Sequence, residues 1–92
     1  MYKIIIDCYD VDQNSGSQAA LEIESEFREH RTWFKFVDCC YADEILTLTA
    51  ISDVDASGSA LLDEFGDCLS AYLSGHGRVV IRSVERSTSG DA

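Results

Sequence analysis

Six segments of this chain have the period of a strand or of a helix, and four of them predict strands. Residues 3–9 form a short apolar, β-branched run, and residues 45–51 alternate between apolar side chains and threonines. These are the patterns of a buried and a half-buried strand. Residues 32–40 are aromatic and β-branched, and residues 78–84 are rich in valine, so both predict further strands.

The other two segments have the helical period. Residues 17–31 and 59–74 each place apolar side chains on one side and acids on the other, which predicts two amphipathic helices. The apolar positions are Ala19, Ala20, Ile23 and Phe27 in the first segment, and Leu61, Phe65, Cys68, Leu69 and Tyr72 in the second. The chain contains no proline, so nothing interrupts either helix.

The resulting order, βαββαβ, is also an internal repeat. Asp10 and Asp53 each follow or end a strand, begin a DVD triplet and lead through serine and glycine into a helix that contains a Glu-Phe pair. Two βαβ halves joined in this way predict an α+β, ferredoxin-like sandwich. Its four-stranded antiparallel sheet would carry both helices on one face.

The length is that of a single domain. We assign residues 1–86 to one ferredoxin-like domain, with halves of about 1–42 and 43–86, and residues 87–92 to a disordered polar tail. The start, MYKIIIDCYD, does not have the pattern of a signal peptide, and no apolar run is long enough to span a membrane. Because the cysteines show no scaffold spacing, we expect a reduced, cytoplasmic protein.

The second DVD loop has the spacing of a calcium loop. In DVDASGSALLDE, positions one, three, five, six and twelve hold Asp53, Asp55, Ser57, Gly58 and Glu64. An aromatic residue follows the glutamate, so the segment resembles an EF-hand loop. It departs from that family at the eighth and ninth positions, which are alanine and leucine, and in having a predicted strand before the loop.

Two interpretations of the DVD loops follow. We expect the loops after the first and third strands to leave from the same edge of the sheet, so that their acids are neighbours. A calcium or magnesium ion would then be bound by Asp10, Asp12, Asp53, Asp55, Ser57 and Glu64. Alternatively, the Asp, Ser and Gly residues only begin two helices, whose positive ends favour acids and hydroxyls. The orientation of Glu64 distinguishes the two.

The charge balance separates the classes of partner. Seventeen acidic and seven basic residues give a net charge of −10. This field repels nucleic acid and anionic lipid and attracts cations and basic proteins. We therefore expect a basic protein as the partner, with no direct contact to nucleic acid or membrane. The side chains predicted to bind it are Glu22, Glu26, Glu29, Asp63 and Asp67 on the helices, together with Trp33 and Tyr9.

The face of the sheet without helices is a second predicted contact surface. The outward residues expected there are Ile5, Asp7, Tyr9, Trp33, Lys35, Val37, Thr47 and Thr49. Aromatic side chains on an exposed sheet are typical interface anchors. This open face therefore predicts a contact with a partner or with a second copy, as in a homodimer.

The pattern assigns no catalytic residue. His30 and His76 have no nucleophile tied to them, and the four cysteines, Cys8, Cys39, Cys40 and Cys68, are interpreted as small core residues, with a zinc site as the alternative. Residues 8–12, CYDVD, resemble the strand end of the Cas2 group, which implies metal-dependent nuclease chemistry at an aspartate. The acidic first helix opposes that function, because a nuclease must approach phosphates.

The sequence therefore predicts a non-enzymatic binding module of the inhibitor, antitoxin or immunity type. It would dock on a basic protein that handles nucleic acid and would need no cofactor. The first alternative is a regulatory module that binds calcium or magnesium through the DVD loops. The second is a Cas2-like, metal-dependent nuclease.

Overall fold

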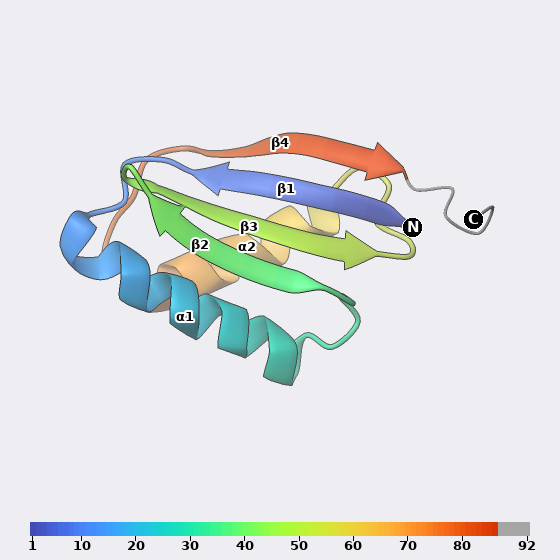
Figure 1. The fold of residues 1–92 in the computed structure, drawn as a ribbon, viewed down its shortest axis with the longest axis horizontal. Coiled ribbons are helices and arrows are strands. Elements are labelled where there is room, and N and C mark those ends of the chain that lie inside the picture. The colour runs from blue at the N-terminus through green and yellow to red at the C-terminus, as the bar shows by residue number, and fades with distance from the viewer. Residues whose placement is uncertain (87–92) are drawn as a thin grey trace.

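The computed structural model describes residues 1–86 and contains the six predicted elements in the predicted order (Figure 1). They are β1 (Tyr2–Cys8), α1 (Gln13–His30), β2 (Val37–Ala42), β3 (Ile45–Ser52), α2 (Ser59–Tyr72) and β4 (Val79–Arg86). The prediction of an α+β, ferredoxin-like βαββαβ sandwich is confirmed. Residues 87–92, predicted to be a disordered tail, lie outside the described residues.

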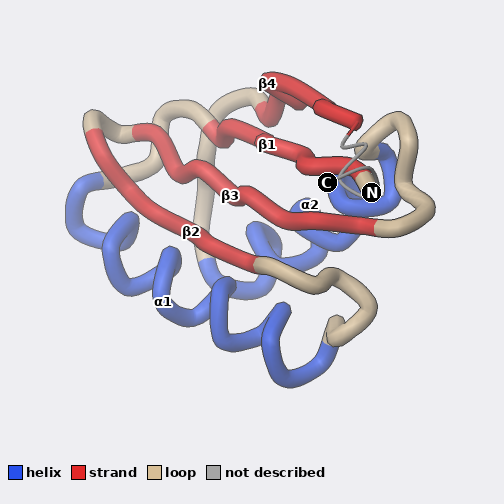
Figure 2. The backbone as a smooth tube through the Cα atoms, turned by 45° about the vertical axis from the view of Figure 1, so that its right-hand side comes forward, coloured by secondary structure: helices blue, strands red, loops and turns tan. Residues whose placement is uncertain are grey.

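The four strands form one antiparallel sheet in the order β2-β3-β1-β4. Both helices cover the same face of this sheet, and the other face is left open (Figures 1 and 2). The two central strands run in opposite directions, because Tyr2 pairs with Ser52 at one end and Cys8 pairs with Leu46 at the other. This direction decides where the loops after β1 and β3 lie.

The core lies between the sheet and the helices, and strand alternation builds it. On β1 and β3 every second side chain faces the helices, and the threonines of β3 face the open side, as predicted. The strand residues with no exposed surface are Ile4, Ile6, Cys8, Leu46, Leu48 and Ala50. The helices contribute their predicted apolar positions, including Ile23, Phe27, Leu61, Phe65 and Leu69, which are also fully covered.

The strand predicted over residues 32–40 begins later, at Val37. The preceding residues form the turn that leaves α1, because Phe34 packs into the core there and is only 4% exposed. As a result, Val37 faces the helices, and Asp38 and Cys40 point to the other side. The prediction that Val37 lies on the open face is therefore wrong.

The outer edge of β2 is closed by side chains of α1. Glu24 Oε1 accepts a hydrogen bond from the Cys39 amide at 2.9 Å, and Arg28 Nη2 donates one to the Val37 carbonyl at 3.2 Å. The two α1 side chains also form an ion pair with 3.0 Å between Arg28 Nη1 and Glu24 Oε2. Covering an edge in this way prevents it from pairing with another strand.

Neither described helix is both long and apolar enough to cross a membrane.

Candidate binding site on the helical face

Charge is distributed unequally between the two layers of the fold. The helices carry seven acidic residues, Glu22, Glu24, Glu26, Glu29, Asp63, Glu64 and Asp67, and one basic residue, Arg28. The strands carry three acidic residues, Asp7, Asp38 and Glu85, and three basic residues, Lys3, Arg82 and Arg86. The negative charge of the ordered elements therefore belongs to the helical layer.

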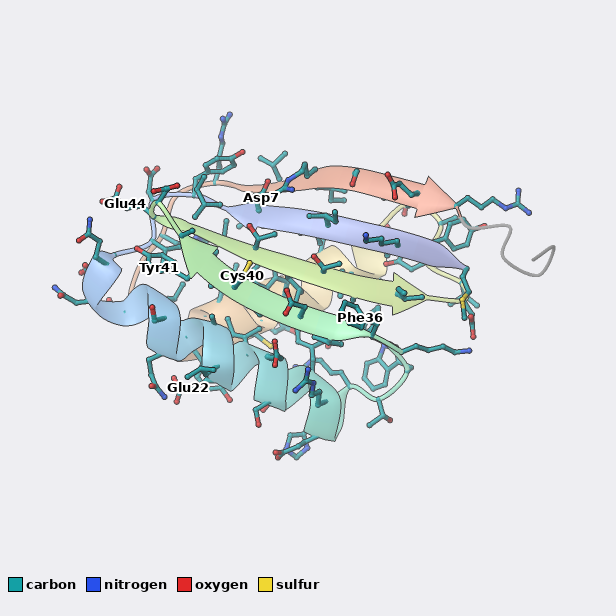
Figure 3. All side chains as sticks on the ribbon, in the orientation of Figure 1. Asp7, Glu22, Phe36, Cys40, Tyr41 and Glu44 are labelled. Atoms are coloured by element: carbon teal, nitrogen blue, oxygen red, sulfur yellow. The ribbon has the colours of Figure 1, made fainter. Side chains whose placement is uncertain are left out.

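A shallow, open groove lies on this layer, along α1 and beside the end of α2. It is lined by Gln18, Leu21, Glu22, Ser25, Glu26, Glu29 and Tyr72. The α1 residues recur at spacings of three and four, which places them along one side of the helix. Figure 3 shows Glu22 pointing away from the sheet. The groove therefore presents three glutamates to any molecule that approaches α1.

Glu26 is held in place from two sides. Arg31 Nη1 donates a hydrogen bond to Glu26 Oε2 at 2.6 Å, and the Tyr72 hydroxyl donates one to Glu26 Oε1 at 3.2 Å. The bond from Arg31 lowers the pKa of the Glu26 carboxyl, against the effect of partial burial. Burial, with the bond to Glu26, raises the pKa of the Tyr72 phenol. Glu26 thus stays ionised, and its orientation is fixed before any ligand arrives.

Three other groove residues, Leu21, Glu22 and Glu29, are exposed and can contact a partner. Within residues 1–86, Glu22 takes part in no side-chain hydrogen bond or ion pair. The neighbouring Leu21 is 66% exposed. Glu29 accepts a hydrogen bond from Ser25 Oγ at 3.0 Å and remains exposed. An exposed leucine between carboxylates suits a partner with an apolar side chain flanked by basic ones.

The remaining side chains predicted to bind a partner do not join this groove. Asp63 and Asp67 are exposed on α2 but do not line it. Trp33 is 58% exposed in the turn after α1, whereas Tyr9 lies beyond the other end of the sheet, with the Arg78 guanidinium 5.2 Å from its ring centre. The seven residues therefore belong to several surfaces, of which the groove gathers three.

The DVD loops lie at opposite ends of the sheet, so the prediction that they are neighbours is wrong. β1 is antiparallel to β3, and the seven paired positions from Tyr2–Ser52 to Cys8–Leu46 separate the two loops. That distance is about 20 Å along the strands. Two strands joined by a helical crossover are parallel, and the following hairpin reverses the third strand. Asp10 and Asp12 therefore cannot share a cation with Asp53 and Asp55.

The oxygens of the second loop bind the protein itself. Asp55, which is 7% exposed, accepts hydrogen bonds from the amides of Ala60 at 3.2 Å and Leu61 at 2.9 Å, at the start of α2. Asp53 forms an ion pair with Lys35, with 2.9 Å between Nζ and Oδ2. The Ser57 hydroxyl is hydrogen-bonded to the Ser59 hydroxyl. The loop therefore begins a helix, as the capping interpretation predicts.

Glu64 does not turn toward this loop. Its Oε1 accepts a hydrogen bond from Arg31 Nε at 2.6 Å, on the side where α2 faces the end of α1. Among residues 1–86, no group of three or more His, Cys, Asp or Glu side chains is arranged to hold a metal ion. The six side chains predicted as cation ligands are thus divided between two ends of the sheet, and five of them, all except Asp10, bind other groups of the protein.

The first DVD loop forms an acidic corner that the sequence pattern did not predict. Asp10, Asp12 and Glu44 line a hollow there. Asp12 begins α1 by accepting a hydrogen bond from the Asn14 amide at 3.0 Å, and the Val11 amide donates one to the Glu44 carbonyl at 3.0 Å. The β2–β3 hairpin brings Glu44 to this place, which only the strand pairing reveals. The nuclease alternative at Asp10 stays a prediction.

The cysteines are dispersed and unpaired. Cys39 faces the helices and Cys40 the open side, because neighbouring residues of a strand point to opposite faces. Cys8 and Cys68 are buried, and burial raises the pKa of each thiol to about 11. The interpretation as small core residues holds for three of the four, and the described residues contain no cluster for the alternative zinc site.

A further polar cluster on the sheet was not anticipated from the pattern. Asp7 lies on the open face, as predicted, but it is only 5% exposed. Arg82 donates two hydrogen bonds to its carboxylate, both at 2.8 Å, and Thr47 Oγ1 donates a third at 2.7 Å. The bonds from Arg82 lower the pKa of the Asp7 carboxyl. An aspartate within an apolar strand was the available signal, because such a residue needs a partner.

The chain matches no protein-family model, and comparison with curated proteins and with solved structures finds no similar protein.

Proposed function

We propose that this protein is a non-enzymatic binding module whose helical face docks on a basic protein. The groove along α1 supports this most directly: it combines three glutamates with Leu21, which is 66% exposed. Glu26 is held by Arg31 and Tyr72, so a partner's lysine or arginine would meet a carboxylate that is already oriented. Preorganisation of this kind reduces the entropy lost on binding.

The charge of the protein supports the same class of partner. The net charge is −10, and the helices carry seven acidic residues and one basic residue. Long-range attraction would therefore accelerate the encounter with a positively charged surface. Proteins that bind nucleic acid carry such surfaces. The proposal is therefore an inhibitor, antitoxin or immunity-type protein that covers the basic surface of a nucleic-acid-handling partner. Its four free thiols suit the reducing cytoplasm.

Paired affinity captures test the proposal. The bait is the wild-type protein, the Glu22→Gln/Glu29→Gln variant, or a control with the same change of charge outside the groove. Asp10→Asn/Asp43→Asn serves as this control, because both aspartates have positive φ angles, which asparagine tolerates. We expect at least one basic protein to be enriched on wild type and control and lost from the groove variant.

The isolated pair then provides a second, kinetic readout. Its association rate should fall about tenfold or more between low and physiological salt, since steered encounters are strongly screened. Replacing Leu21 with Gln should instead increase the dissociation rate. A partner retained equally by all three baits would contradict the proposal. So would an association rate that is indifferent to ionic strength.

A further inference from the structure

We propose that the open face of the sheet is the interface of a symmetric homodimer. Two rows of side chains cross this face over all four strands. The strand pairing places Asp38, Thr49, Ile5 and Ser83 in one row and Cys40, Thr47, Asp7 and Val80 in the next. No described helix packs over either row. Figure 3 shows Cys40 on β2 and Asp7 on β1.

The middle of this face is nearly neutral and is bordered by charged residues. Ile5, Thr47 and Thr49 occupy its centre. Phe36, 50% exposed, and Val80, 38% exposed, add apolar surface toward two corners. Charged side chains lie at the margin, among them Lys3, Asp38 and Glu85. A neutral centre inside a polar rim is the ordinary composition of a specific protein interface.

Asp7 is the one acidic residue of the two central strands, β1 and β3. Its carboxylate needs no hydrogen bonds from water. Arg82 and Thr47 together donate three hydrogen bonds to its carboxylate, and the residue is 5% exposed in the single chain. The usual cost of covering a carboxylate arises from lost hydration. In this fold, three protein donors already replace water at the Asp7 carboxylate, so a second copy can cover Asp7 with little further loss of hydration free energy.

The distribution of charge favours this face over the other. Two chains with a net charge of −10 repel each other, and the helices carry seven acids against one basic residue. The strands are balanced, with three acids and three basic residues. When two sheets pack face to face, both helical layers point away from the interface. This arrangement keeps the like charges farthest apart and leaves both acidic grooves accessible.

Pairing through the outer edge of β2 is blocked. Glu24 and Arg28 already bind the Cys39 amide and the Val37 carbonyl of that edge strand. A dimer that extends the sheet through β2 would have to break both hydrogen bonds. Stacking of the open faces breaks none of them. The closed edge therefore favours face-to-face packing over sheet extension at β2.

The size of the face indicates a weak, reversible association. Strands of about seven residues at ~3.3 Å each, with four strands ~4.8 Å apart, give roughly 450 Å² per copy before side-chain relief is counted. Two copies would bury roughly 900 Å², which is below the ~1,200–2,000 Å² of standard stable interfaces. We therefore expect a weak, reversible dimer that forms at high protein concentration.

The full chain provides its own reporter of this contact. Cys40 is exposed on the open face, and the other three cysteines are buried. Sedimentation velocity over a concentration series should show monomer at high dilution and dimer at high concentration. Over the same series, the rate constant for alkylation of Cys40 by iodoacetamide should fall at least threefold. Both changes should have the same midpoint.

Two variants test which face of the molecule forms the dimer contact. Thr49→Lys introduces a charge at the centre of the open face and should keep the protein monomeric, with Cys40 reacting at the monomer rate. Leu21→Lys makes a similar change on the helical face and should leave the dimer intact. If Thr49→Lys does not fold, Val80→Lys provides the same test near one corner of the face.

The outcomes separate this inference from the proposed function. A protein that stays monomeric at millimolar concentration overturns the homodimer, as does a dimer that leaves Cys40 fully reactive or survives Thr49→Lys. None of these results affects the groove. Conversely, Glu22→Gln/Glu29→Gln should abolish capture of the basic partner without changing sedimentation.

Discussion

Arg31 connects the end of α1 to the side of α2 through Glu64. Its Nε donates a hydrogen bond to Glu64 Oε1 at 2.6 Å, while Nη1 donates one to Glu26 at the same distance. The Arg31 side chain is 17% exposed, and its guanidinium lies 5.6 Å from the centre of the Phe27 ring. The glutamate at the twelfth position of the calcium-like loop therefore serves to join the two helices.

Replacing Arg31 with methionine should lower the free energy of unfolding by about 1–3 kcal/mol, because two half-buried carboxylates lose their charged donor. Methionine keeps the apolar stem over Phe27. Urea denaturation measures the change.

Lys35→Met is the matched control for Arg31→Met. It removes an ion pair with Asp53 in which both side chains are about half exposed. Such surface pairs contribute about 0–1 kcal/mol. If the two variants lost equal stability, Arg31 would not have the role assigned to it.

Asp55 provides a test that separates helix capping from cation binding. Asp55→Ala should destabilise the fold by about 1–2 kcal/mol, since the amides of Ala60 and Leu61 lose their acceptor. The loss should be the same in a chelator and in millimolar calcium. Asp53→Ala should have little effect. A melting temperature that rises with calcium for wild type and not for Asp55→Ala would instead indicate a cation site.

The sequence predicted every element of this fold, because local periodicity carries that information. It did not predict how the elements bring loops together. The DVD repeat suggested one cation site at one edge, yet the direction of β3 relative to β1 places Asp10 and Asp53 at opposite ends. The acidic corner at Glu44 and the Asp7–Arg82 pair were missed for the same reason, since both depend on strand pairing.

The groove on α1 was partly predictable. Helical spacing placed Glu22, Glu26 and Glu29 on the polar side of the helix, and the structure gathers them. The spacing could not show that Tyr72 and Arg31 hold Glu26, because those contacts come from α2 and from the residue after α1. Exposed Leu21 gave a weak signal, as an apolar residue among polar ones on the outer side of the helix.

Gly16 is required because Tyr41 lies against it. A Cβ atom at Gly16 would overlap the Tyr41 ring, whose hydroxyl donates a hydrogen bond to the Val11 carbonyl at 2.7 Å. Gly16→Ala should therefore destabilise the protein by about 1–3 kcal/mol, although alanine favours a helix by about 1 kcal/mol.

The double variant Gly16→Ala/Tyr41→Ala distinguishes this overlap from other causes. In the absence of the Tyr41 ring, Gly16→Ala should become neutral or stabilising, and thermal denaturation measures both differences. An equal loss in the two backgrounds would show that Tyr41 is not the obstacle.

The Asp7–Arg82 pair predicts how stability depends on pH. Its hydrogen bonds lower the pKa of the Asp7 carboxyl below the unfolded value of about 3.9. The stabilisation is therefore fully present above that value and is lost as pH falls through the lower, folded value. Asp7→Asn should cost about 1–2 kcal/mol near neutral pH, and the difference from wild type should shrink below about pH 4.

Arg82→Met provides the control for the pH dependence of Asp7. Without the guanidinium, the pKa of the Asp7 carboxyl should rise toward its unfolded value or above it, so the part of the acid-induced loss of stability that comes from Asp7 should shrink or disappear. Urea denaturation at several pH values detects this weaker pH dependence. An acid transition that is unchanged in both variants would mean that other carboxylates dominate it.

The thiols should differ in reactivity by position. Burial raises the pKa values of Cys8 and Cys68 to about 11 and also raises that of Cys39, whereas Cys40 is exposed. The thiolate is the reactive form, so only the Cys40 thiol should react rapidly with a disulfide reagent in the folded protein at mildly alkaline pH. The three buried thiols should react at the rate of unfolding, and in denaturant all four thiols should react together. The measurement is made at high dilution, where the protein is monomeric. Cys40→Ser should remove the rapid phase entirely, and a second rapid thiol in that variant would place another cysteine at the surface.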